Sequence, residues 1–244
     1  MNRPQHIELG RPARPGQLIL QRRFNLARQL IANLDNTELM LDLGCGNGAQ
    51  TVHFASSAKR LIGVDVVPIT QAESSLSSGL FNFIQSDAGY LPFRSGIYNL
   101  VTAFEILEHV PDDRLALKEV ARVLKSSGLF LLSVPNKWWV FESHGATVPG
   151  LNWIPWNRMP LIGWLPGFLH RKIARARIYT IKSAGKLVEE AGLRVRAKGY
   201  ITAPLDVFPE GRMRNTLRST IFKSDTTRIP FLAVNLFLLC QKDP

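Results

Sequence analysis

The chain has 244 residues, 45% hydrophobic and 20% charged, so its composition is that of a globular protein and not of a disordered one. Its net charge of +11 indicates either an anionic partner, with nucleic acid and an anionic membrane surface as the two main candidates, or simply a means of keeping the protein soluble. The two cysteines, Cys45 and Cys240, are far apart, which excludes a disulfide framework and indicates a reducing compartment. We see no secretory signal, and the longest apolar runs are about half the length of a transmembrane helix, so we expect a cytoplasmic protein.

Strands and helices are expected to alternate through most of the chain. After a Pro/Gly/Arg-rich arm, apolar residues recur at helical spacing over 17–34. The other expected helices cover 47–58, 68–78, 112–125 and 180–193, the third starting at Pro111 and Asp112 and the last with Thr180 as N-cap and Gly192 as its end. Apolar runs predict strands at 38–44, 60–67, 80–87, 97–104, 128–136, 193–202 and 231–242.

This alternation predicts an α/β fold, a doubly wound and mostly parallel seven-stranded sheet with an antiparallel edge strand. Four parts are expected. Residues 1–36 form an arm and an amphipathic helix, and 37–136 form the cofactor-binding half of the core. Residues 137–179 are too long for an ordinary connection and form a Trp-rich cap insert, and 180–244 complete the core.

The strongest motif is the glycine loop LDLGCGNG at 41–48, where a strand runs into a turn. Glycines let a backbone approach a ligand closely and adopt positive φ. About twenty residues later, Asp65 closes the second strand, where a carboxylate can accept both hydroxyls of a ribose. The loop and this carboxylate predict a nucleotide-like cofactor.

A dinucleotide and a sulfonium cofactor both fit the glycine loop alone, because Gly44, Gly46 and Ala49 satisfy a loose dinucleotide fingerprint. Asp42 stands two residues before Gly44, where its charge repels a pyrophosphate but suits an ammonium or a sulfonium group. Asp87 closes the third strand, where it is placed to meet an adenine amino group. The fourth strand also runs into FEILEHVPDD, which a dehydrogenase does not require.

The segments LDLGCGNG, GVD, SDAGYLPF and FEILEHVPD, in this order and spacing, resemble the class I S-adenosylmethionine-dependent methyltransferases. The nearest branch is the broad one that contains the ubiquinone and menaquinone biosynthesis enzymes. The resemblance covers 39–136 with high specificity and extends at fold level through the last three elements, but 137–179 and 204–230 fall outside it.

The resemblance implies S-adenosyl-L-methionine as the cofactor, with S-adenosyl-L-homocysteine as the product. It implies that the methionyl end meets the glycine loop, that the ribose hydroxyls and the adenine meet the second and third strand ends, and that residues after the fourth strand flank the methionine moiety. Arg22 or Arg23 could reach the cofactor carboxylate from the first helix. The implied cofactor-binding residues are Asp42, Gly44, Gly46, Asp65, Val66, Asp87, Ala88, Phe104 and Glu105.

Methyl transfer from a sulfonium needs a general base only where the acceptor must lose a proton. His144 and Glu142 follow the fifth strand and are the candidate catalytic residues, with His144 as base and Glu142 as its orienting or substrate-binding partner. The alternative is that His144 satisfies backbone groups of the insert. We interpret Glu108 and His109 as structural more readily than as an acid–base pair, Cys45 as a packing residue, and we expect no metal.

All five tryptophans lie in the insert, with four prolines between 149 and 166 and the basic run HRKIARARIY. Three interpretations compete: a hydrophobic cap on the sheet, a lid that walls an acceptor pocket, and a membrane-facing element with Trp and Arg at the headgroup level. We combine the last two. A second basic group could extend such a face: Arg212, Arg214, Arg218 and Lys223.

We therefore expect single-step methylation, first of all on oxygen, of a lipophilic small molecule or lipid. Peripheral contact with an anionic membrane, at its inner face, is the expected partner interaction. An RNA or nucleotide methyltransferase is the alternative, since tryptophans can stack on bases, but no RNA-binding appendage is evident. A non-catalytic cofactor-binding protein is a third alternative, and the intact loop and carboxylates argue against it.

Overall fold

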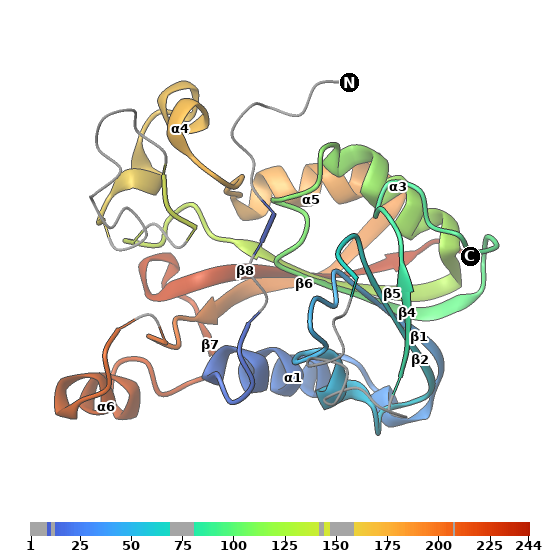
Figure 1. The fold of residues 1–244 in the computed structure, drawn as a ribbon, viewed down its shortest axis with the longest axis horizontal. Coiled ribbons are helices and arrows are strands. Elements are labelled where there is room, and N and C mark those ends of the chain that lie inside the picture. The colour runs from blue at the N-terminus through green and yellow to red at the C-terminus, as the bar shows by residue number, and fades with distance from the viewer. Residues whose placement is uncertain (1–8, 11–12, 69–80, 142–143, 147–158, 207) are drawn as a thin grey trace.

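The computed structural model describes residues 9–10, 13–68, 81–141, 144–146, 159–206 and 208–244. One mixed sheet runs through the described molecule, with strand order β3-β2-β1-β4-β5-β8-β6-β7 (Figure 1). Helices α3 and α5 cover one face of it and α1 covers the other. This is the doubly wound α/β fold predicted from the sequence.

The parallel half of the sheet holds the glycine-loop strand at its centre. Strand β1 (Thr37–Leu43) pairs in parallel with β2 (Ala58–Asp65) and β4 (Tyr98–Phe104), and β2 pairs in parallel with β3 (Asn82–Gln85). Both faces are covered by other elements, which explains why these strands are continuous apolar runs and do not alternate. Because the strands are parallel, the ends of β1, β2 and β4 meet at one edge of the sheet.

The antiparallel pairs gather at the other end of the sheet. Strand β8 (Ala233–Lys242) lies between β5 (Leu124–Pro135) and β6 (Leu193–Thr202), and is antiparallel to both. The two-residue strand β7 (Thr226–Thr227) adds an antiparallel edge to β6. The sheet thus has eight strands where seven were predicted, because β7 is too short to produce a sequence pattern.

The helices follow the expected start and stop signals. Helix α1 spans Leu18–Leu30, α3 spans Asp113–Val123 and α5 spans Ile181–Glu190. The Asp112 side chain caps α3, and Thr180 forms a capping box with Ser183 at the start of α5. Gly192 ends α5 with φ 85°, a conformation that favours glycine.

The helix predicted over 47–58 is wrong. Only a 3₁₀ turn, η2 (Thr51–Phe54), forms there, between turns. Gly48 has φ 81°, the Asn47 side chain accepts a bond from the Ala49 N–H at 3.1 Å, and β2 begins at Ala58, so little chain remains for an α-helix. The helix predicted over 68–78 lies almost wholly outside the described residues.

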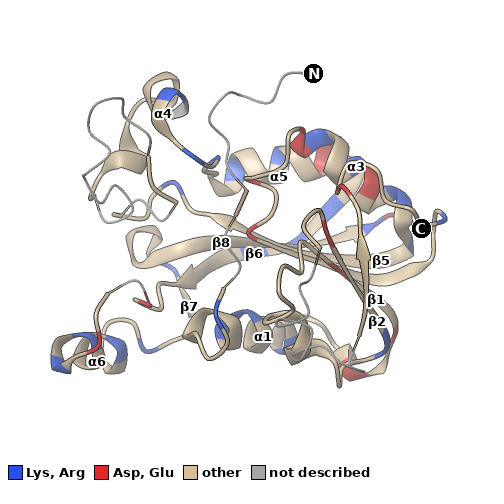
Figure 2. Ribbon diagram, in the orientation of Figure 1, with Lys and Arg blue, Asp and Glu red and all other residues tan. Residues whose placement is uncertain are grey.

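The described part of the insert is held to the sheet at its two ends, by a bridge between Asn136 and Tyr179. It contains the 3₁₀ turn η4 (Ile162–Trp164) and α4 (Gly167–Ile173), whose sequence carries Arg171 and Lys172 and no acidic residue (Figure 2). Helix α6 (Arg212–Ser219) follows β6, and the 3₁₀ turn η5 (Pro230–Leu232) follows β7. The 3₁₀ turn η1 (Leu34–Asn36) precedes β1.

The tryptophans of the insert divide between core and surface. Trp139 is buried with Ala203, Leu205 and Phe222, and packs edge-on against Phe222. Trp138 and Trp164 are each 39% exposed. Trp153 and Trp156 lie outside the described residues.

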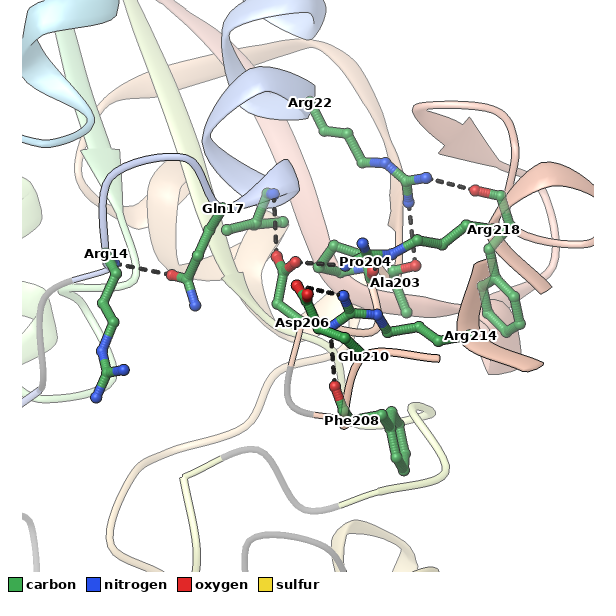
Figure 3. Close-up of polar contacts among 12 residues, drawn as sticks. Arg14, Gln17, Arg22, Ala203, Pro204, Asp206, Phe208, Glu210, Arg214 and Arg218 are labelled. Atoms are coloured by element: carbon green, nitrogen blue, oxygen red, sulfur yellow. Dashed lines mark hydrogen bonds and ion pairs between the residues drawn. The ribbon is translucent and has the colours of Figure 1, made fainter. Parts of the chain in front are cut away.

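A buried arginine ties α1 to the segment that carries α6. Arg22 donates to the carbonyls of Thr202 and Ala203 at 2.7 and 3.1 Å, and to that of Phe222 (Figure 3). Within the same segment Arg218 donates to the Pro204 carbonyl and the Asp206 carboxylate, and Arg214 donates to Phe208 and Glu210. Arg214 and Arg218 therefore serve intramolecular contacts, contrary to the expectation that they extend a basic surface.

No helix in the described ranges is long and apolar enough to cross a membrane.

Candidate active site

A cavity of about 420 Å³ opens where β1, β2 and β4 end. Its walls come from the glycine loop, the residues after β2, β3 and β4, helix α1 and part of the N-terminal arm. Every cofactor-binding residue named from the sequence lines it: Asp42, Gly44, Gly46, Asp65, Val66, Asp87, Ala88, Phe104 and Glu105. The sequence-based assignment therefore selected residues that the fold brings together.

The glycine loop is held open by backbone bonds and by positive φ angles. Gly44 and Gly46 have φ of 76° and 53°. The Gly44 N–H donates to the Val64 carbonyl at 2.7 Å, which ties the loop to β2. A Cβ on Gly44 would lie 2.7 Å from the Ile106 side chain. Glycine is required here both by the backbone angle and by the close approach.

Asp42 lies under the loop and is almost fully buried. Its two carboxylate oxygens accept bonds from Thr51 Oγ1 at 2.6 Å and Thr102 Oγ1 at 2.7 Å. Burial raises the pKa of Asp42 to about 6, against the opposing effects of the two hydroxyls and of Arg23. The group is thus ionised at neutral pH and places a negative charge beside the cavity, where it favours an ammonium or a sulfonium.

The carboxylates at the ends of β2 and β3 stand on the other wall. Asp65 accepts from the Gly46 N–H at 2.8 Å and the Val67 N–H at 3.0 Å, one bond on each oxygen. Asp87 accepts from the Gly89 N–H at 2.8 Å. Val66 is 41% exposed beside them and offers an apolar surface. A ribose with a planar apolar base fits this combination.

Glu105 and Arg23 form the polar wall after β4. Arg23 Nη2 lies 2.9 Å from Glu105 Oε2, and Asn235 donates to Glu105 Oε1 at 2.8 Å. Burial acts to raise the pKa of Glu105, but Arg23, His144 and the Asn235 bond outweigh it and lower that pKa to about 2. The Arg23 guanidinium also lies 5.6 Å from the ring centre of Phe104. Of the two candidate arginines, Arg23 lines the cavity and Arg22 points away from it.

The candidate base His144 does not line the cavity. Its Nε2 lies 3.6 Å from Oε1 of the buried Glu108, and its ring centre lies 5.1 Å from that of His109. His109 does line the cavity. Glu142 lies outside the described residues, so its proposed role stays a prediction.

Glu108, His109 and His144 each have a potential metal-ligand atom, and these atoms lie within 4.8 Å of one another. Within the described residues, this is the one group of three or more such side chains that could hold a metal ion. Our expectation of no metal stays a prediction.

Several site residues were missed from the sequence. Thr51, Thr102 and Asn235 carry no motif, although Asn235 is a polar residue within an otherwise apolar run and that irregularity is a usable signal. Leu9, Gly10 and Ala13 of the arm also line the cavity. A Cβ on Gly10 would lie 2.8 Å from the His109 ring, so the N-terminal arm packs against the loop that follows β4.

A match to a family model described as a methyltransferase domain covers residues 41–132. The chain is 29% identical over 116 residues to a Mycobacterium tuberculosis protein named "Probable S-adenosylmethionine-dependent methyltransferase"; this match covers 48% of the chain and 42% of that relative. It is 26% identical over 182 residues to the ubiquinone biosynthesis O-methyltransferase of Bartonella tribocorum, covering 70% of this chain and 68% of the other. The chain thus spans less than half the length of the mycobacterial relative.

Solved structures show the same fold. An S-adenosylmethionine-dependent methyltransferase from Mesorhizobium loti has a TM-score of 0.60 at 14% identity, covering 91% of this chain and all of the other. The [4+2]-cyclase SpnF has the same TM-score at 17% identity, covering 98% and 86%. At these identities the likeness concerns the fold alone.

Over residues 41–132 the chain is therefore similar to S-adenosylmethionine-dependent methyltransferases, and its fold is the one that solved members of that class have. The domain match and the names of these relatives imply S-adenosyl-L-methionine as the cofactor.

Proposed function

We propose that the protein transfers a methyl group from S-adenosyl-L-methionine to an oxygen atom of a lipophilic acceptor. The observation that carries the proposal is the cavity itself, in which a glycine loop with positive φ angles, a buried ionised Asp42 and the strand-end carboxylate of Asp65 face one volume. This combination suits a cationic cofactor with a ribose better than a pyrophosphate.

The cofactor supplies a methyl group on a sulfonium, which the acceptor oxygen takes as an O–C bond forms, the C–S bond breaks and the electron pair stays on sulfur. The chain has to hold and align the two reactants. Asp65 would bind the ribose hydroxyls and Val66 the adenine. Asp42 would favour the positive charge of the cofactor, and Arg23 its carboxylate.

An oxygen acceptor is favoured because an imidazole lies near the cavity. His144, with Glu108 beside it, would take the proton that a hydroxyl or phenol loses. The Bartonella relative is named as an O-methyltransferase, which supports oxygen as the acceptor atom. Methylation of carbon or nitrogen needs no such base where the acceptor atom carries no proton to be removed.

Calorimetric titration tests the cofactor assignment. We expect S-adenosyl-L-methionine to bind with a micromolar Kd and NAD to give no heat at the same concentrations, because a pyrophosphate would face Asp42. Binding of NAD and not of the sulfonium compound would refute the proposed function.

Exposed rings of the insert and of the segment just before β8 support a membrane contact. Trp138, Trp164 and Phe231, which we call the aromatic patch, are 39%, 39% and 46% exposed. Phe231 packs against both tryptophans, at 6.5 and 5.3 Å between ring centres, and Trp164 Nε1 donates to the Trp138 carbonyl. The Lys137 ammonium lies 5.9 Å from the Trp138 ring. Fixed amphipathic rings beside cations are favoured at an anionic bilayer surface.

Vesicle sedimentation tests the membrane contact. We expect binding to phosphatidylglycerol vesicles, weak binding to phosphatidylcholine vesicles, and an affinity about tenfold lower when Trp138 and Trp164 are both changed to alanine, about 1.4 kcal/mol. Tyr90→Ala is the matched control, since Tyr90 is 73% exposed and lies outside the aromatic patch. If the double variant bound phosphatidylglycerol vesicles as tightly as the native protein, the aromatic patch would not be the membrane contact. If the native protein bound RNA and no vesicles, a nucleic-acid acceptor would be favoured.

A further inference from the structure

Glu108 is a buried carboxyl without a conventional partner. It is 0% exposed, and neither of its oxygens accepts a hydrogen bond from the described part of the chain. The arginines near it are engaged elsewhere, since Arg23 pairs with Glu105 and the Arg177 guanidinium donates to loop carbonyls. Buried charged groups in proteins are paired or bind a metal ion. Packing within the described chain therefore gives no reason for a carboxyl at this position.

Two imidazoles face this carboxyl. Oε1 of Glu108 lies 3.6 Å from Nε2 of His144 and 4.0 Å from Nε2 of His109. One potential ligand atom from each of the three residues lies within 4.8 Å of the other two. Metal–ligand bonds of about 2.0–2.1 Å at tetrahedral angles place ligand atoms about 3.3–3.4 Å apart. Small rotations of the side chains therefore bring all three atoms within bonding distance of one ion.

Backbone contacts hold the segments that carry these three side chains. The Arg177 N–H donates to the Glu108 carbonyl at 3.3 Å, and the Arg177 guanidinium donates to two further carbonyls of the same loop at 2.6 and 2.9 Å. Two residues after His144, Ala146 forms a β-bridge with Ala174. The end of the insert thus contacts both ligand-bearing segments. Ligands on segments fixed in this way keep the geometry of a metal site.

We propose that Glu108, His109 and His144 form a binding site for a divalent transition-metal ion. Two imidazoles and one carboxylate are a ligand set that suits ions such as Zn²⁺ and Fe²⁺ and leaves coordination positions open. The site goes beyond the proposed function and reverses our expectation of no metal. That expectation was drawn from a sequence in which His144 is far from the other two ligands.

The site adjoins the cofactor cavity, because His109 lines that cavity. An open position of the ion there would bind the acceptor hydroxyl and lower the pKa of its proton, which passes to water. The oxygen then forms the O–C bond as the C–S bond breaks. With the ion bound, His144 is a ligand, and the ion replaces it in activating the acceptor. This role rests on the proposed function, whereas the metal site itself does not.

Metal titration of protein treated with EDTA tests the site. Co²⁺ is the first probe, because its visible absorption reports coordination by protein ligands, and Zn²⁺ is then added in competition. We expect one ion per chain with a micromolar Kd. Glu108→Gln and His144→Gln should each weaken binding about 100-fold, the upper end of what loss of a supporting group costs in metal sites. The matched controls, Glu190→Gln and His53→Gln, change a carboxylate and an imidazole outside the cluster and should bind as the native protein does.

Three results would overturn the metal site. They are native protein that binds neither ion, Co²⁺ binding that persists unchanged in a folded Glu108→Gln or His144→Gln variant, and a native long-range ¹⁵N spectrum in which Zn²⁺ shifts no pair of imidazoles. The last measurement needs no variant to fold. Calorimetry with S-adenosyl-L-methionine on the same samples separates the two claims. Metal binding without cofactor binding refutes the proposed function and leaves the site, and cofactor binding without metal binding does the reverse.

Discussion

Asp65→Ala is expected to weaken S-adenosyl-L-methionine binding about 1,000-fold. Two hydrogen bonds from ribose hydroxyls to a carboxylate contribute roughly 1.5–3 kcal/mol each, so their loss corresponds to about 10²–10⁴ in Kd. The same carboxylate holds the Gly46 and Val67 N–H groups, so the variant also loosens the glycine loop. Calorimetric titration of native and variant protein gives the ratio directly.

Two further variants separate recognition from loop support. Asp65→Asn keeps one acceptor oxygen for the backbone N–H groups and should retain an intermediate affinity. Asp243→Ala is the control. It removes a carboxylate near the C-terminus that pairs with Arg194 at the start of β6, and this variant should bind S-adenosyl-L-methionine as the native protein does. An Asp65→Ala protein that folds normally and binds within tenfold of native would show that the ribose does not lie at this strand end.

The part of the fold that was predictable from sequence is the part where one local signal decides the structure. Apolar runs that end at glycine or aspartate gave the strands, and Asp112, Thr180 and Gly192 gave helix ends, because capping depends on a few neighbouring atoms. The grouping of the candidate cofactor-binding residues was predictable too, since the ends of parallel strands must meet at one edge. Asp42, Asp65 and Asp87 line one cavity for that reason.

The features that the sequence did not reveal depend on contacts between distant segments. Arg22 and Arg23 are adjacent in α1, yet the first bonds carbonyls of the 202–222 segment and the second faces the cavity. Helix periodicity cannot separate two neighbours in this way. The failed helix over 47–58 has a local cause, since turn-forming Asn47 and Gly48 outweigh a weak helical pattern. Nothing in the sequence indicates that Glu108 and His144 come within 3.6 Å of each other.

Arg23→Met is expected to lower the free energy of unfolding by about 2–3 kcal/mol at neutral pH, measured by urea denaturation without cofactor. The change removes one partner of a buried ion pair and leaves Glu105 charged, which typically costs about 3–5 kcal/mol; we lower this figure because the Glu105 side chain is 31% exposed. Arg28→Met is the control on the same helix, because Arg28 is 58% exposed, and its effect should stay within about 0.5 kcal/mol.

The pH dependence of this loss identifies its cause. In the native protein the Glu105 pKa is lowered to about 2, so its ionisation contributes stability above its usual pKa of 4.5, and this contribution is lost as pH falls from 4.5 towards 2. Without Arg23, burial instead penalises the carboxylate, and protonation relieves the penalty. The difference between native and Arg23→Met should therefore be largest above pH 5 and shrink on acidification. Glu105→Gln in the Arg23→Met background should recover about half of the loss at neutral pH, since an uncharged amide can keep a hydrogen bond with Asn235. A loss that is independent of pH and unchanged in the double variant would assign the effect to lost packing of the arginine stem.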